Sequence, residues 1–214
     1  VNNKKSRIEL LIQKKDADSS IENQVTRLNE IPEHWRYEQD HVMVAHQVVA
    51  LLLHDVNNDG LTDIVYAGQP NVMVILEQQS DGTFKKVRTH KVNGLGANFN
   101  AFSISNLVGD ELPEIITVVN GDITLFSLDG TSLCKPIRLN TKDRVLAFEY
   151  ADYDGNGLED IVGIIPDSSE PIRLWLTHNQ EDKRAIGPQH RFEMPPLRKF
   201  VSINLSRKSK ALMA

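Results

Sequence analysis

Residues 55–65 read Asp-Val-Asn-Asn-Asp-Gly-Leu-Thr-Asp-Ile-Val, and residues 152–162 read Asp-Tyr-Asp-Gly-Asn-Gly-Leu-Glu-Asp-Ile-Val. Both segments follow one pattern. Acidic or amide side chains stand at positions 1, 3, 5 and 9, glycine at position 6 and leucine at position 7. Two copies of so specific a pattern indicate that the chain is internally repeated, and a repeat determines the fold before any other feature does.

Two weaker copies support the repeat. Residues 106–116 keep a polar residue at position 1, the leucine at position 7 and an acid at position 9, but Val108 and Glu111 replace the polar residue at position 3 and the glycine. Residues 204–213 resemble the pattern in outline and contain three basic side chains. The four copies begin at residues 55, 106, 152 and 204, so their spacings are 51, 46 and 52 residues.

Short segments rich in Val, Ile, Phe and Tyr lie around and between these copies, separated by Asp-Gly and Asn-Gly turn signals. The predicted strands cover residues 48–54, 63–67, 72–77 and 84–88, then 99–105, 114–119 and 123–127, then 145–150, 160–164 and 171–177, with a longer loop expected around 180–188. About four short strands per roughly 50 residues is typical of the blades of a β-propeller.

We therefore predict an all-β fold, a β-propeller built from four-stranded blades, and an incomplete set of a longer propeller. Residues 1–214 are expected to form a single propeller segment. The predicted parts are 1–47 (the end of a preceding blade plus a long loop), the successive blades 48–98, 99–144 and 145–197, and 198–214 (the start of a further blade).

The acidic loops carry the candidate chemistry. In a tight loop, alternate side chains can point toward one centre, and Ca²⁺ takes six to eight oxygen ligands at about 2.3–2.6 Å. The glycine at position 6 permits the positive φ that such a loop needs. We predict two calcium sites, each with four side-chain ligands and one backbone carbonyl. The first consists of Asp55, Asn57, Asp59, Asp63 and the carbonyl of Leu61, and the second of Asp152, Asp154, Asn156, Asp160 and the carbonyl of Leu158.

The loop pattern has two other interpretations, an EF-hand and Asx-turns without a metal. An EF-hand needs a bidentate Glu at position 12 and flanking helices, but position 12 is Tyr66 or Gly163 and both flanks read as strands, so the EF-hand is rejected. Asx-turns without any metal, in which Asp and Asn bond their own backbone, remain the alternative. In the copy at 106–116, the changes at Val108 and Glu111 predict that no tight calcium site forms.

Residues 55–65 and 152–162 resemble the calcium loops of FG-GAP/VCBS repeats, which build the seven-bladed propeller of integrin α-subunits and of many bacterial surface or secreted proteins. The resemblance spans about residues 42–178, and the chain lacks the Phe-Gly and Gly-Ala-Pro pair that names the FG-GAP class. It implies that the two predicted ions stabilise their blades while other loops or domains bind ligands. It also implies an extracellular, cell-surface or envelope location.

Composition limits the remaining functions. The net charge of −5 argues against a nucleic-acid binder, and no apolar run approaches the roughly 18 residues of a membrane span. The seven histidines show no zinc-site spacing, and no catalytic set can be read, so we expect no enzyme. The predicted function is a calcium-stabilised binding or scaffold module for a protein or glycan partner. The propeller body of a polysaccharide-degrading enzyme and an intracellular protein-interaction propeller remain alternatives.

Overall fold

The computed structural model describes residues 1–13, 37–98, 101–109, 112–129, 132–133, 136–166, 168–180 and 183–194. This part of the chain is all-β, as predicted, with one short 3-10 turn, η1 (Asn3–Lys5). Among these residues, no helix has the length and apolarity needed to span a bilayer. The predicted blade start at 198–214 and the segment 14–36 of the predicted long loop lie outside the described residues.

The strands form three four-stranded antiparallel sheets in which strands adjacent in sequence pair with each other. The first sheet holds β3 (Gln47–His54), β4 (Asp63–Gln69), β5 (Val72–Gln78) and β6 (Phe84–Lys91). The second holds β7 (Phe102–Ser105), β8 (Glu114–Val119), β9 (Asp122–Phe126) and β12 (Ile137–Arg138), and the third holds β13 (Ala147–Ala151), β14 (Asp160–Ile164), β15 (Ile172–Gln180) and β16 (Lys183–Phe192). Two hairpins complete the described fold: β1 (Arg7–Gln13) with β2 (Tyr37–Met43), and β10 (Leu128–Asp129) with β11 (Ser132–Leu133).

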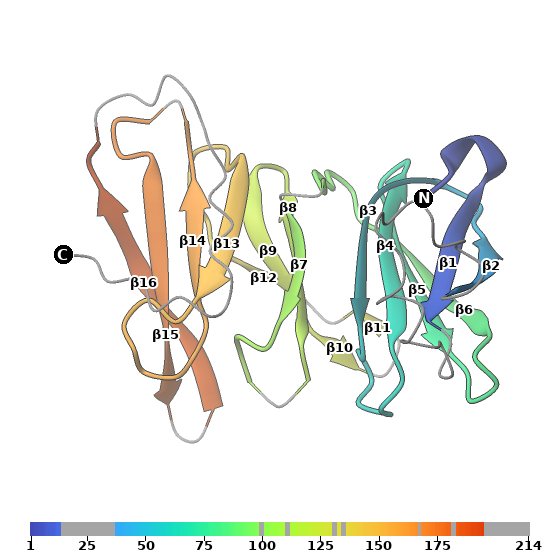
Figure 1. The fold of residues 1–214 in the computed structure, drawn as a ribbon. Coiled ribbons are helices and arrows are strands. Elements are labelled where there is room, and N and C mark those ends of the chain that lie inside the picture. Colours follow the sequence, from blue (N-terminus) through green and yellow to red (C-terminus); the bar gives the residue numbers. More distant parts are fainter. Residues whose placement is uncertain are drawn as a thin grey trace, which may run out of the picture.

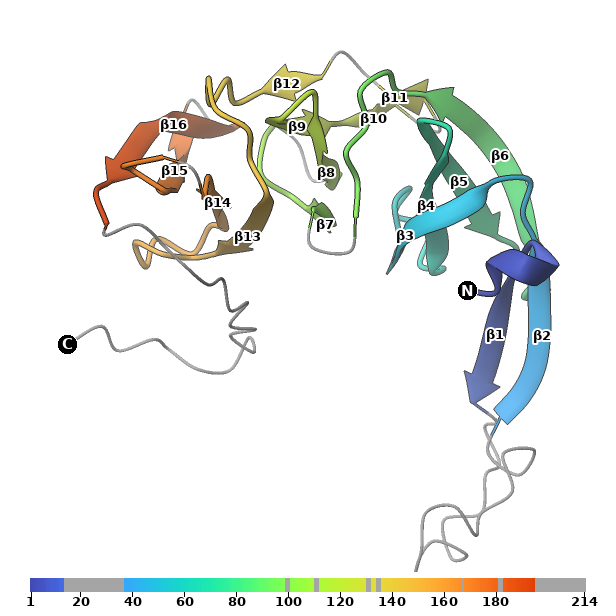
Figure 2. The same cartoon turned by 90° about the horizontal axis from the view of Figure 1, so that it is seen from above.

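The three sheets follow one another along an arc, with the β1–β2 hairpin beyond the first sheet (Figure 1 and Figure 2). The first strand of each sheet lies toward the inside of the arc, and the last strand lies toward the outside (Figure 2). In the described part of the chain, the first sheet therefore lies between the β1–β2 hairpin and the second sheet, and the second sheet lies between the first and the third.

This stacking explains why the central strands read as continuous apolar runs. Successive side chains of a strand point to opposite faces of its sheet. On β4, Val65 and Ala67 belong to the core shared with the second sheet, whereas Ile64 and Tyr66 belong to the core shared with the β1–β2 hairpin. The strand is therefore buried on both faces, and six of its seven residues are buried.

The second and third sheets approach each other closely at Gly163 on β14. A Cβ atom added there would lie 2.9 Å from the Ile123 Cδ1 atom and 3.3 Å from the Trp175 ring. Ile123 and Trp175 are themselves buried in the core between these two sheets. A side chain at this position would therefore force the Ile123 side chain of the neighbouring sheet to shift.

The predicted strands at 114–119 and 160–164 are confirmed residue for residue by β8 and β14. The loop predicted around 180–188 is wrong, because most of that segment belongs to β16, which pairs with β15. β16 is an outer strand in which none of the residues is fully buried, so its sequence lacks the apolar pattern of a strand.

The first strand of the second sheet begins at Phe102 rather than at residue 99, and residues 99–100 lie outside the described part. The blade boundaries at 48, 99, 145 and 198 stay a prediction.

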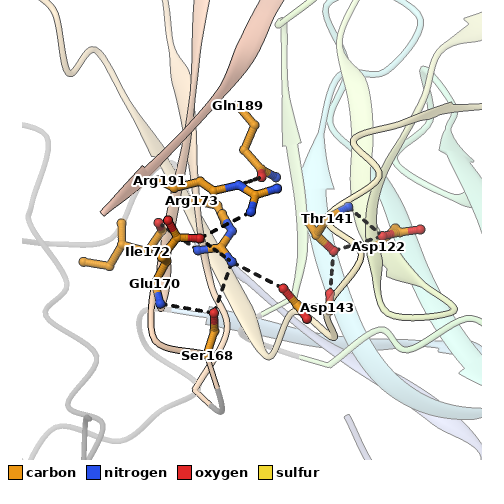
Figure 3. A network of polar contacts seen from close by, with 9 residues as sticks. All are labelled: Asp122, Thr141, Asp143, Ser168, Glu170, Ile172, Arg173, Gln189 and Arg191. Atoms are coloured by element: carbon orange, nitrogen blue, oxygen red, sulfur yellow. Dashed lines mark hydrogen bonds and ion pairs between the residues drawn. The ribbon is translucent and has the colours of Figure 1, made fainter. Parts of the chain in front are cut away.

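A polar network ties the third sheet to the connection that precedes it (Figure 3). The Arg173 side chain is 1% exposed, and its Nη2 atom lies 3.3 Å from Asp143 Oδ2 and 3.2 Å from Ser168 Oγ. The network continues to the second sheet, because Asp122 Oδ1 accepts hydrogen bonds from both the backbone N–H and the hydroxyl of Thr141. These contacts lie near the β8–β9 turn, at the end of the sheets that we call the turn end.

Candidate metal centre

Three loops occupy the opposite end of the sheets, which we call the loop end (Figure 1). Each loop joins the first strand of a sheet to its second strand: 55–62 joins β3 to β4, 106–113 joins β7 to β8, and 152–159 joins β13 to β14. The three copies of the sequence pattern therefore occupy equivalent positions in three successive sheets.

The first loop is closed by hydrogen bonds from its own backbone to its acidic and amide side chains. The two carboxylate oxygens of Asp55 accept from the backbone N–H groups of Asp59 (3.1 Å) and Gly60 (2.8 Å). Asn57 Oδ1 also accepts from the N–H of Asp59, and Asp59 Oδ1 accepts from the N–H of Leu61 at 2.8 Å. The side chains at positions 1, 3 and 5 are thus turned inward by the backbone they bind.

The second loop repeats this arrangement position by position. Asp152 accepts from the N–H groups of Asn156 (3.0 Å) and Gly157 (2.9 Å). Asp154 Oδ1 accepts from the N–H of Asn156, and Asn156 Oδ1 accepts from the N–H of Leu158 at 2.7 Å. These are the Asx-type bonds of the metal-free alternative. They leave further lone pairs on each carboxylate, so they are compatible with a bound cation.

Left-handed backbone also recurs at matching positions. At position 6, Gly60 has φ +85° and Gly157 has φ +87°, and at position 4 Asn58 and Gly155 have φ values of 60° and 80°. A Cβ atom on Gly60 or Gly157 would meet nothing within 4 Å. Glycine at position 6 is therefore favoured by the backbone conformation and not by lack of space.

The acid at position 9 anchors each loop to the sheet. Asp63 and Asp160 are fully buried. Asp63 accepts from the N–H groups of Val56 and Gln78, and Asp160 accepts from those of Tyr153 (2.8 Å) and Thr177 (2.7 Å). Each position-9 acid thus joins its loop to the third strand of the same sheet.

Burial raises the pKa of Asp63 above its ordinary value, and the nearby charges of Asp59 and Asp55 raise it further, while its two backbone hydrogen bonds act in the opposite direction. Carboxylates that share a small space repel each other when ionised. A cation among them would remove that repulsion.

The second loop brings three carboxylates together. Ligand oxygens of Asp152, Asp154 and Asp160 all lie within 4.8 Å of one another, and this is the one such group of acids, histidines or cysteines in the described part of the chain. Two oxygens that each lie about 2.4 Å from a calcium ion can be no more than about 4.8 Å apart, so this group has the right size. The hydroxyl of Thr177, which is 1% exposed, has no hydrogen-bond partner among the described residues, and the N–H of the same residue binds Asp160. The all-oxygen donor set of the three carboxylates fits a hard cation.

The predicted ligands of the first loop are arranged by the same hydrogen bonds, but Asp55, Asp59 and Asp63 do not form such a compact group. The predicted carbonyl ligands belong to Leu61 and Leu158, and both residues are half-buried. Coordination of an ion by either set of residues stays a prediction.

The loop at 106–113 differs in the way that its sequence predicts. Val108 offers no side-chain oxygen at position 3, and residues 110–111 lie outside the described part. The position-9 acid keeps its anchoring role, because Glu114 Oε2 accepts from the N–H groups of Leu107 (2.8 Å) and Val108 (3.1 Å). The guanidinium of Arg184, on β16 of the third sheet, donates to the carbonyl of Asn106 at 3.1 Å. A cationic side chain thus stands beside the loop that lacks the metal ligands.

Sequence reasoning missed the residues that support the loops from elsewhere in the fold. The N–H groups of Gln78 and Thr177 bind the position-9 acids of the first and second metal loops, from 15 and 17 residues further along the chain. The hydroxyl of Ser127 donates to Glu114 from 13 residues further along. No fixed spacing could have identified these supports, because the strands and the connections between each acid and its support differ in length.

Comparison with known proteins agrees with this geometry. The family model described as FG-GAP-like repeat matches residues 55–105, which include the first loop, strands β4, β5 and β6 of the first sheet, and β7 of the second. No curated protein matches the chain. Residues 55–105 of this chain are therefore similar to an FG-GAP-like repeat.

Proposed function

We propose that this chain is a calcium-stabilised β-propeller segment that acts as a binding or scaffold module and is not itself catalytic. The observation that carries the proposal is the pair of loops at 55–63 and 152–160, which have matching hydrogen bonds and stand at the same place in two sheets. The FG-GAP-like match over 55–105 supports a propeller-type module.

The residue types of both loops suit calcium, and the compact group of Asp152, Asp154 and Asp160 supports the second of the two proposed sites. The first ion would be held by Asp55, Asn57, Asp59, Asp63 and the Leu61 carbonyl, and the second by Asp152, Asp154, Asn156, Asp160 and the Leu158 carbonyl. The ion would supply the positive charge that offsets the crowded carboxylates. Because each loop joins two strands and its position-9 acid bonds a third, binding would stabilise three of the four strands of its sheet.

The partner-binding surface is proposed for the turn end. A groove of about 1010 Å³ lies there, between the β6–β7 connection, the β8–β9 turn and the connection that precedes β13. Polar and charged side chains of both signs line it, among them Asn98, Asp122, Lys142 and Arg144. Such a lining suits hydrogen bonding to a protein or a glycan, and the net charge of −5 disfavours a nucleic acid. The proposed location is extracellular, at the cell surface or in the envelope. Calcium would occupy even sites of modest affinity there, since extracellular modules bind calcium with Kd values of about 10⁻⁴–10⁻³ M.

The proposal is tested by calorimetric titration of chelator-treated protein with CaCl2. Two binding events are expected in the wild type, and one in each of the variants Asp59→Ala and Asp154→Ala. Titration with MgCl2 is the control, because Mg²⁺ demands a tighter octahedral site and should bind more weakly. A wild-type chain that binds no calcium at millimolar concentration would contradict the proposal.

A further inference from the structure

At the loop end, the third sheet and its loop contact two consecutive residues of the second repeat: Ser105, at the end of β7, and Asn106, the first residue of the following loop. The hydroxyl of Ser105, the last residue of β7, donates a hydrogen bond to the carboxylate of Glu159. The carbonyl of the next residue, Asn106, accepts from Arg184 Nη1 at 3.1 Å, and the carbonyl of Arg184 accepts from the N–H of Gly109 at 3.0 Å. The junction of the two sheets is thus held here by one acidic and one basic side chain.

The acidic contact comes from within the candidate metal loop. Glu159 stands between Leu158 and Asp160, two residues of the proposed second calcium site. Asp160 is fully buried and fixed by two backbone hydrogen bonds, whereas Asp152 and Asp154 are exposed. Glu159 therefore belongs to a loop that is fixed at one end by Asp160 and exposed at Asp152 and Asp154.

The basic contact is independent of that loop. Arg184 lies on β16, and its partners Asn106 and Gly109 lie in the loop whose position 3 is Val108. Within the described ranges, the first candidate metal loop shows no counterpart to the acidic contact. Its residue equivalent to Glu159 is Thr62, whose N–H bonds Gln78 Oε1 within the same sheet at 3.1 Å. The junction between the second and third sheets therefore combines a contact from a candidate metal loop with one that needs no metal.

We propose that calcium binding by the 152–160 loop is coupled to the docking of the third sheet on the second, through the hydrogen bond between Glu159 and Ser105. This inference rests on the proposed function, because it assigns a consequence to the second calcium site. An ion among Asp152, Asp154 and Asp160 removes their mutual repulsion and holds the loop in one conformation. The Glu159 carboxylate is then held against Ser105, which is 5% exposed at the sheet junction. Arg184 holds the same junction whether or not calcium is bound.

The coupling has a thermodynamic consequence that can be measured by substituting Ser105 and titrating calcium. If calcium strengthens the contact, the contact must strengthen calcium binding by the same factor. Ser105→Ala removes the hydroxyl without altering any residue of the metal loop. Ser103→Ala is the matched control, because Ser103 lies two residues earlier on the same strand and is not part of this contact.

The experiment is a calorimetric calcium titration of the whole chain in an Asp59→Ala background, so that only the second loop titrates. Ser105→Ala is expected to raise the calcium Kd about fivefold or more, the lower range of ordinary coupling between sites, and Ser103→Ala should leave it unchanged. Hydrogen exchange provides a second measurement that needs no substitution at the junction. Calcium should slow exchange of the β7 amides in the wild-type chain.

Equal calcium Kd values for Ser105→Ala and Ser103→Ala, or β7 exchange that calcium does not change, would overturn the coupling while leaving the proposed calcium sites intact. Failure of the second loop to bind calcium at all would overturn the proposed second site together with this inference. The two failures are therefore distinguishable.

Discussion

The N–H group of Thr177 donates a hydrogen bond of 2.7 Å to the buried carboxylate of Asp160, although the two residues are 17 positions apart in the chain. The other oxygen of Asp160 accepts from the N–H of Tyr153 at 2.8 Å. Asp160 therefore has a structural role that is independent of any metal, whereas the exposed Asp154, among the residues that the structure describes, forms hydrogen bonds with Asn156 of its own loop only.

This difference predicts opposite behaviour for two similar substitutions. Asp160→Asn places an amide N–H against a backbone N–H donor and leaves one buried donor unpaired, so we expect the free energy of unfolding to fall by about 1–3 kcal/mol even in EDTA. Asp154→Asn should have little effect in EDTA and should weaken calcium binding. Urea denaturation with and without calcium measures both quantities. Equal stability of the two variants in EDTA would contradict the anchoring role of Asp160.

Calcium is expected to stabilise the chain against heat. A ligand that binds only the folded state at 100 times its Kd adds about 2.7 kcal/mol. In a chain of this size that corresponds to a rise in Tm of about 5–10 °C per site. Scanning calorimetry in CaCl2 and then in excess EDTA measures the rise and its reversal.

Variants assign that rise to particular loops. Asp59→Ala and Asn156→Ala should each remove part of it. Asp110→Ala, in the loop predicted not to bind calcium, should leave the rise intact. A loss in Asp110→Ala as large as that in Asp59→Ala would show that the loops were distinguished wrongly.

Backbone conformation at position 6 provides a third prediction. Gly157 has φ +87° and open space around its Cα atom, so Gly157→Ala should cost about 1–2 kcal/mol through conformation alone. Gly157→Asn should cost less, because Asn tolerates the left-handed region, as Asn58 does at position 4 of the first loop. Urea denaturation in EDTA separates these values from any effect on metal binding. A larger cost for the Asn variant would show that side-chain contacts, and not φ, govern this position.

The Arg173 network of Figure 3 predicts an asymmetry between partners. Arg173 is buried, but the Asp143 side chain is 49% exposed and can be solvated on its own. Asp143→Ala leaves a buried guanidinium whose remaining acid, Glu170, is 3.9 Å away, so a loss of about 1–3 kcal/mol is expected. Arg173→Met removes the buried charge and keeps an unbranched side chain, so its cost should be smaller. Urea denaturation of the two variants tests this order, and the reverse order would contradict it.

The features that could be predicted from sequence are those set by neighbouring residues. The limits of β8 and β14 were correct because both strands are largely buried and follow directly from an acidic loop. The hydrogen bonds within the loops follow from residue type and spacing alone, which is why the loops at 55–63 and 152–160 are closed in the same way.

Features set by the tertiary fold could not be predicted. β16 contains Gly187 and Pro188, and its pairing with β15 is irregular just there, between Trp175 and Thr177. Proline is tolerated on an outer strand where no ladder hydrogen bond is needed, but in the sequence it reads as a loop. The contact between Glu159 and Ser105 joins residues 54 positions apart, and no local pattern indicates it.

The connecting segments at the two ends of the sheets differ in how much their lengths vary. The loops at 55–62, 106–113 and 152–159 all contain eight residues, whereas the segments between the second and third strands contain two residues at 70–71, two at 120–121 and seven at 165–171. Length is therefore constrained where side chains must converge on a common centre, and variable where the chain reverses direction. A short insertion in 165–171 should consequently be accommodated as long as the contacts of Ser168 and Glu170 with Arg173 are kept, whereas the same insertion in 152–159 should disrupt the loop.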